Sequence, residues 1–368
     1  MRKKDSRAKK EAHERSSESK TSRRYRLQPD EVDVLEKYRR IHDEAVSAGI
    51  DPNTVKAGWL KSEDASLYFK NPNFKTVEQL GIENLAVQVV EDVKKYAPIY
   101  PKVKRAKTKD GHLLVVDIAD LHINKYAESD LTGNEYSSSI AVERALEGTK
   151  GIIQKASGFN IDKIVFVIGN DVLNTDTMTS TTTKGTFQNT DMHWFKAFNL
   201  AKDCYIKCIE LCMQVADVDV IHCPSNHDFM SGSFLAETLN AWFRNSKNVS
   251  FETSPSYRKY YQYFNNMLEF EHGHNGKLAN IPLVMAQEKP RMWADTKFRY
   301  GYLHHVHHSD KTSFKSGKDY IGVNITYLRS PSSADIWHSD SQYINLVAVE
   351  GFIHSKEMGR VSQITHYF

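Results

Sequence analysis

Three apolar stretches decide the fold: LLVVDIADLH at residues 113–122, IVFVIGND at residues 164–171 and VIHCPSNHD at residues 220–228. Each begins with a short run rich in β-branched residues, which is typical of a strand buried on both faces. The spacing predicts amphipathic helices between them, over residues 139–156 and 194–215. Because strands and helices then alternate along the chain, we expect the three strands to pair in parallel.

The C-terminal third of the chain has a different pattern. Beyond Trp242 we expect mostly strands, near residues 249–251, 260–264, 268–271, 298–303, 321–327, 343–349 and 361–367, with one helix near Leu278. Two mixed sheets packed face to face with helices outside would accommodate so many strands. The predicted fold class is therefore α/β, as a four-layer α-β-β-α sandwich with a small N-terminal helical region.

Charge divides the chain of 368 residues unevenly, although its formal net charge is only +3. Residues 1–24 contain ten Lys or Arg and four Asp or Glu, a balance of +6, with almost nothing apolar. We expect a disordered basic tail, which either binds nucleic acid or only aids solubility. Residues 25–105 are predicted to form a helical module and linker, with a helix restarting at residues 55–59, and residues 106–368 the main domain.

Several classes of protein are disfavoured by what the sequence lacks. The longest apolar run, residues 164–168, is far shorter than the roughly 20 residues that cross a membrane. No apolar segment of a secretory signal follows the N-terminal charges. The four cysteines do not have the spacing of a disulfide framework, so we expect reduced thiols and a cytoplasmic location without membrane contact.

Acidic and imidazole side chains follow the predicted strands. Asp120 and His122 follow the first strand, Asp171 the second, and Asn226, His227 and Asp228 the third. Further histidines follow later strands, at His272, His274, His305, His307 and His308. Ligands gather at the carboxyl ends of strands, and residues i and i+2 of an extended segment share a face. Carboxylate, imidazole and amide donors without thiolates favour Mn²⁺, Fe or Zn²⁺.

These residues resemble the calcineurin-like metallophosphoesterases. The family pattern runs Asp-x-His, Gly-Asp, Gly-Asn-His-Asp/Glu, His and Gly-His-x-His, and all five blocks occur here in order between Asp120 and His307. Three glycines of the pattern are replaced, by Asn170, Ser225 and His304. The resemblance covers residues from about 106 onward. Its implied fold is the family's two-sheet sandwich, and the chain also looks like phage-encoded members, which would place it in the host cytoplasm.

The resemblance implies two divalent metal ions, with manganese as the expected metal. Asp171 would bridge them, the first metal would be held by Asp120, His122 and His307, and the second by Asn226, His272 and His305. A metal-bridged hydroxide would attack phosphorus, and His227, oriented by Asp228, would act as general acid for the leaving oxygen.

Other polar residues offer weaker signals. Asp191 and His193 form a second Asp-x-His, but they precede a predicted helix, where Asp191 is more simply an N-cap. Residues 175–186 include seven threonines and Lys184, which indicates a loop that either holds a phosphate backbone or is uninvolved. We expect His274, His308 and Lys184 to contact substrate.

The substrate class stays open at this point. A nuclease-like phosphodiesterase acting on nucleic acid fits the metal pattern beside the basic tail, and repair-type nucleases of the family are the model. A phosphomonoesterase or phosphoprotein phosphatase would use the same ligands. A non-catalytic DNA-associated scaffold is the third interpretation.

Overall fold

The computed structural model describes residues 43, 46–47, 56–61, 66–70, 97–105, 109–118, 120–305, 317–333 and 346–368. The chain divides into two units, Met1–Asp92 and Val93–Phe368. Within the first, β1 (Ala57–Lys61) pairs antiparallel with β2 (Ser66–Lys70). The helix predicted over residues 55–59 is therefore wrong where β1 begins. Trp59 and Leu60 are compatible with a strand. Trp59 pairs with Tyr68 of β2, and such a partner, distant in sequence, cannot be seen in a local helical pattern.

Parallel strands form the centre of the second unit, as the alternating pattern predicts. The six-stranded sheet has the order β13-β12-β3-β4-β5-β6. Its parallel strands are β3 (His112–Asp117), β4 (Ile161–Gly169), β5 (Asp217–Cys223) and β6 (Val249–Glu252). The antiparallel pair β12 (Ala348–Ser355) and β13 (Gly359–Tyr367) completes the sheet beside β3.

A five-stranded sheet with the order β10-β11-β9-β8-β7 packs against the first. It consists of β7 (Lys259–Tyr263), β8 (Asn266–Glu271), β9 (Phe298–Leu303), β10 (Gly317–Tyr320) and β11 (Val323–Tyr327). The single strand predicted over residues 321–327 begins instead with the turn of a hairpin that joins β10 to β11. Gly322 in this turn has a φ of 76°, and the strand starts only after it.

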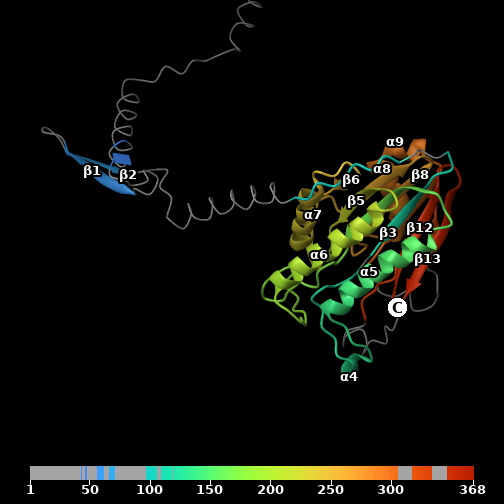
Figure 1. Cartoon of the computed structure of the whole chain (residues 1–368), viewed down its shortest axis with the longest axis horizontal. Coiled ribbons are helices and arrows are strands. Elements are labelled where there is room, and N and C mark those ends of the chain that lie inside the picture. The colour runs from blue at the N-terminus through green and yellow to red at the C-terminus, as the bar shows by residue number, and fades with distance from the viewer. Residues whose placement is uncertain are drawn as a thin grey trace, which may run out of the picture. The chain divides into compact units, whose positions relative to one another are not determined.

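Helices cover the outer faces of both sheets (Figure 1). On the first sheet lie α5 (Ser138–Lys155), α6 (Trp194–Met213) and α7 (Phe229–Phe243). On the second lie the 3-10 turn η3 (Leu278–Asn280), α8 (Ile281–Glu288) and α9 (Pro290–Asp295). A short α4 (Ser129–Thr132) precedes α5. Of the described helices, none is both long and apolar enough to cross a bilayer.

Successive side chains of the central strands point to opposite faces of the sheet and so contribute to two hydrophobic cores. Leu114 and Val116 of β3 pack against the helices, whereas Leu113 and Val115 face the second sheet. A third core lies between the second sheet and α8. The four-layer α-β-β-α sandwich is therefore confirmed. Cys204, Cys208 and Cys212 are buried along α6 in the helix-side core, and all four cysteines are free thiols.

The inter-sheet core sets the first stability prediction. Phe352 is fully buried and stacks on Tyr302, with ring centroids 4.3 Å apart. Phe352→Ala should lower the free energy of unfolding by about 3–5 kcal/mol, because a large cavity is left between the sheets. Urea denaturation measures this. Leu283→Ala, at an exposed site on α8, should change it by less than about 0.5 kcal/mol; equal losses in the two variants would contradict the described core.

Candidate metal centre

Loops at the carboxyl ends of β3, β4 and β5 carry the polar cluster. Their backbone is left-handed at Asp120 (φ 50°), His122 (φ 48°), Asn170 (φ 53°) and Asp171 (φ 61°). The predicted reason why Asp120 and His122 lie on one side, that both belong to an extended segment, is therefore wrong, because neither residue is extended. Non-glycine residues in this region are strained and gather at functional sites. Asn170 takes the left-handed conformation that asparagine tolerates best.

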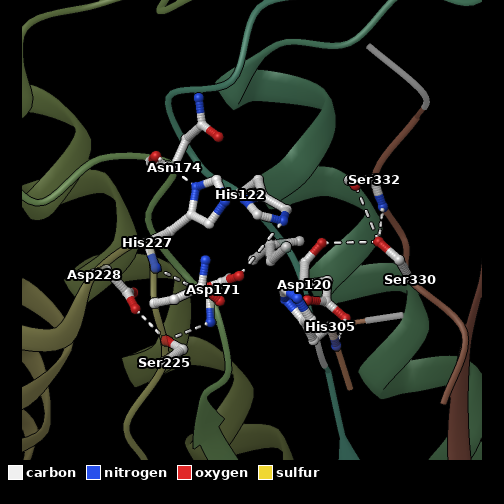
Figure 2. Close-up of polar contacts among 12 residues, drawn as sticks. Asp120, His122, Asp171, Asn174, Ser225, His227, Asp228, His305, Ser330 and Ser332 are labelled. Carbon is white, nitrogen blue, oxygen red and sulfur yellow. Dashed lines mark hydrogen bonds and ion pairs between the residues drawn. The ribbon is translucent and has the colours of Figure 1, made fainter. Parts of the chain in front are cut away.

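Asp171 is the centre of the cluster (Figure 2). Its Oδ2 lies 3.1 Å from Nε2 of His272 and 4.0 Å from Nε2 of His122. Its Oδ1 accepts a hydrogen bond of 2.9 Å from the backbone N–H of His227. Asp171 therefore belongs to two groups whose ligand atoms all lie within 4.8 Å of one another: His122, Asp171 and His227, and Asp171, His272 and His305.

The ligands expected for the second metal come together around Asp171. Nε2 of His272 lies 2.8 Å from Oδ1 of Asn226, and the rings of His272 and His305 are 5.0 Å apart. Three elements supply them, since Asn226 follows β5, His272 follows β8 and His305 follows β9. Strand ends of both sheets therefore contribute to one donor set.

The ligands expected for the first metal are described in part. Oδ2 of Asp120 accepts a hydrogen bond of 3.2 Å from the backbone N–H of His305, and its carbonyl accepts one from Ser330. Asp120 and His122 are both buried. His307, the third expected ligand, and His308, an expected substrate contact, lie outside the described residues.

His227 and Asp228 are arranged differently from the prediction. Nδ1 of His227 lies 3.0 Å from the carbonyl oxygen of Asn174, so this carbonyl orients the imidazole. The carboxylate of Asp228 instead accepts hydrogen bonds from Leu173 N and Ser225 Oγ. Asp228 therefore supports the loops after β4 and β5, close to Asp171. The hydrogen bond expected between Asp228 and His227 is replaced by one between Asn174 and His227.

Ser225 has a role that its sequence position did not show. Its hydroxyl accepts from Asp171 N at 2.8 Å and donates to Asp228. Where the family pattern has glycine, the serine therefore ties the loop after β4 to the loop after β5. The replacement of the pattern's glycine by serine was the signal in the sequence for this role, because a buried serine hydroxyl needs a hydrogen-bond partner.

Mutual electrostatics tune the cluster. Burial raises the pKa of Asp171, but the charges of His272 and His227 outweigh it and hold the pKa well below its usual value. Burial raises the pKa of Asp120 to about 6 and that of Asp228 to about 7. Burial and the charge of His272 lower the pKa of His305 to about 4. Asp171 thus stays ionised, while the imidazole of His305 is neutral at physiological pH.

These residues fit divalent metal ions. Oδ1 of Asp120 is buried and has no hydrogen-bond donor among the described residues, whereas Oδ2 of Asp171 faces the imidazoles of His272 and His122. A buried carboxylate oxygen without a donor is costly unless a cation neutralises it. Neutral imidazole is also the form of histidine that binds metal. The donor set of carboxylates, imidazoles and one amide therefore suits the metals expected from the sequence.

Two expected substrate contacts border the cluster. Nδ1 of His274 lies 3.0 Å from the hydroxyl of Tyr257, and its ring lies 5.3 Å from that of His272. Burial, His272 and His305 lower the pKa of His274 to about 4, and the charge of Lys184 adds to this effect. Lys184 is exposed. Tyr257 was missed, because it lies before β7, far from any motif.

The weaker sequence signals have structural partners. Asp191 accepts hydrogen bonds of 2.6 and 2.7 Å from N and Oγ of Ser138, so it stabilises the start of α5 rather than α6. Thr175 and Thr182 are buried, which contradicts a wholly solvent-exposed loop. Asp176 holds this segment to α7 by accepting from the backbone N–H groups of Met230 and Ser231.

The membership of Asp171 in both groups of candidate ligands predicts the effect of removing its charge. Asp171→Asn should weaken Mn²⁺ binding by about 100-fold or more, because loss of an outer partner of a metal ligand already costs about 10–100-fold. Isothermal titration calorimetry of the full chain measures this. The matched control is Asp203→Asn, on the exposed side of α6, which should bind Mn²⁺ as the unaltered chain does. Full affinity in Asp171→Asn would place the metal elsewhere.

A buried pair behind the cluster predicts a stability effect. Nε2 of His304 lies 3.3 Å from Oδ2 of Asp117, and both side chains are fully buried at the ends of β9 and β3. Asp117→Ala should lower the free energy of unfolding by about 1–3 kcal/mol, because the buried imidazole of His304 loses its polar neighbour. In a double-mutant cycle with His304→Ala, the two losses should not add. Additive losses would show that the residues do not interact.

No protein-family model matches the chain, and no curated protein does. Among solved structures, a double mutant of Vps29 from Entamoeba histolytica is similar over 70% of this chain and 99% of that chain, with 10% identity and a TM-score of 0.26. A TM-score this low carries no weight. The fold and the metal centre therefore rest on the geometry described above.

Proposed function

We propose that the chain is a binuclear-metal phosphoesterase, as its resemblance to the calcineurin-like metallophosphoesterases implies. One observation carries the proposal: a single buried carboxylate, Asp171, belongs to two groups of candidate metal ligands. Two cations sharing one carboxylate suit phosphoryl chemistry, because they stabilise both the attacking and the leaving oxygen. Mn²⁺ is the proposed metal, although Fe and Zn²⁺ accept the same donors.

The chain's own residues would hold two metal ions in this way. Asp171 would be shared, with Asp120, His122 and His307 on one side and Asn226, His272 and His305 on the other. When bound, the two ions would activate a water nucleophile and neutralise charge on the phosphoryl group. Ser225 would hold the backbone N–H of Asp171 in its left-handed loop, while Asp228 would hold the Ser225 hydroxyl and the backbone N–H of Leu173.

His227 is proposed as the general acid. The Asn174 carbonyl can only accept, so Nδ1 of His227 carries a proton directed at it. The other ring nitrogen, Nε2, is then free to transfer a proton. When the imidazole is protonated, Nε2 would donate its proton to the leaving oxygen. The backbone N–H of His227 is held by Asp171, so the acid and the shared carboxylate have a fixed relation.

The proposed substrate is a phosphodiester of nucleic acid. Support comes from the basic residues 1–24 of the sequence and from Lys184, whose positive charge reaches His274 at the edge of the cluster. A cationic side chain beside a phosphoester site suits a polyanion, because phosphate contacts position nucleic acid on a protein.

Substrate assays test the reaction class. With Mn²⁺, the full chain should hydrolyse single-stranded or duplex DNA and bis-p-nitrophenyl phosphate, and chelation should abolish both activities. Activity on p-nitrophenyl phosphate alone would replace the diesterase with a monoesterase. Hydrolysis of none of these substrates, with Mn²⁺ bound, would leave a non-catalytic scaffold.

The role of His227 predicts a dependence on the leaving group. His227→Ala should lower kcat on DNA by about 10²–10⁴-fold, the usual contribution of general acid catalysis. It should affect bis-p-nitrophenyl phosphate much less, because p-nitrophenolate leaves without a proton. Mn²⁺ affinity should be unchanged. If His227→Ala instead lost metal affinity and both activities together, His227 would be a metal ligand, as its membership of the His122 and Asp171 group allows.

A further inference from the structure

Exposed aromatic side chains gather beside the metal centre. The solvent-exposed fractions are 68% for Phe187, 62% for Phe195, 41% for Phe229 and 59% for Phe234. Exposed Met178 and Met230 accompany them. We refer to these six residues as the aromatic rim. Phenylalanine is usually buried, and exposed apolar groups that cluster mark interaction sites.

Hydrogen bonds and a ring contact join the three segments that carry the aromatic rim. The backbone N–H of Phe229, at the start of α7, donates to Thr183 Oγ1 in the segment of Phe187. Nε1 of Trp194, at the start of α6, donates to Ser231 of α7 at 3.1 Å, and the Trp194 ring contacts that of Phe195 at 5.3 Å. The starts of α6 and α7 and the threonine-rich segment are therefore held against one another.

The aromatic rim adjoins the proposed acid. Phe229 is two residues after His227, and Asn174, which orients His227, is two residues before Asp176. Asp176 in turn accepts from Met230 and Ser231 at the start of α7. On α7, Met230 and Phe234 are four residues apart and so lie on the same side of the helix.

Charge on this surface suits an anion. Lys184 and Lys196 are exposed within the same segments. Of the carboxylates nearby, Asp176 accepts from the backbone of α7 and Asp191 from Ser138, whereas the exposed Glu237, three residues after Phe234, accepts from Thr253. The surface therefore offers cations and aromatic faces together, next to a site for phosphate esters.

We propose that the aromatic rim binds unpaired bases of a single-stranded nucleic acid, stacking them on Phe187, Phe195, Phe229 and Phe234 while Lys184 and Lys196 contact its phosphates. This rests on, and deepens, the proposed function, because it selects single strands over duplexes. Stacking on aromatic side chains beside a basic track is how proteins hold single strands without reading sequence. A duplex keeps its bases stacked inside and cannot use these rings.

Binding without catalysis tests this inference. The probe is a fluorescein-labelled oligothymidylate of about 12 nucleotides, a length within the range of single-strand sites, measured by anisotropy with the full chain in EDTA at fixed salt. Phe195→Leu with Phe234→Leu should weaken binding by about tenfold or more, since each lost stack costs on the order of one decade. Phe195→Trp with Phe234→Trp keeps the aromatic faces and should stay within about twofold of the unaltered chain.

The controls separate stacking from folding. Phe264→Leu removes an equally exposed phenylalanine between β7 and β8, and it should leave oligothymidylate binding unchanged. A duplex of the same length should respond to none of the variants, and oligouridylate in place of oligothymidylate shows whether RNA is held equally. Unchanged oligothymidylate affinity in the Phe195→Leu and Phe234→Leu variant would overturn the inference and leave a protein partner for the rim.

Hydrolysis separates this inference from the proposed function. If oligothymidylate binding depends on the phenylalanines but no phosphoester is hydrolysed with Mn²⁺, the aromatic rim stands and the phosphoesterase fails. If bis-p-nitrophenyl phosphate is hydrolysed but the phenylalanines do not affect binding, the phosphoesterase stands and the rim fails.

Discussion

The shared carboxylate of Asp171 is the constraint on which the rest of the centre depends. It lies in a buried, left-handed loop, ionised because surrounding imidazoles outweigh the cost of burial. Keeping it there requires both sheets, since His272 and His305 come from the second sheet and Asn226 and His227 from the first. The inter-sheet core and the Asp117–His304 pair join the two sheets and so help to hold these ligands in place.

Much of the architecture could be predicted from the sequence, because the strands at the centre are buried on both faces. Runs such as Ile164–Ile168 are apolar at every position, and that pattern is local. The β1–β2 hairpin and the turn at Gly322 were missed, because strand pairing and left-handed turns depend on partners that a local pattern does not contain. Helix α7 was also not predicted, because Ser231, Gly232 and Ser233 near its start have low helix propensity.

The candidate site divides in a similar way. Which residue types follow the strands can be read along the chain, and Asp171, Asn226, His272 and His305 are indeed brought together. The groups that orient these side chains cannot be predicted from the sequence in this way, because the orienting contacts join segments that are distant along the chain. Asn174 rather than Asp228 holds His227, and Asp191 stabilises α5 rather than α6. Neighbours in sequence were assumed to be partners, whereas the loops give each side chain a direction that only the folded backbone defines.

The position of β12 has a consequence for biosynthesis. This strand lies between β13 and β3, so β3 keeps one bare edge while the whole intervening chain is being made. A ribosome-bound nascent chain would therefore display an apolar, unpaired strand for most of its translation, which is an opportunity for wrong association. Completion of the six-stranded sheet must wait until β12 and β13 have been made, so this topology closes its centre later than one whose strands pair in order.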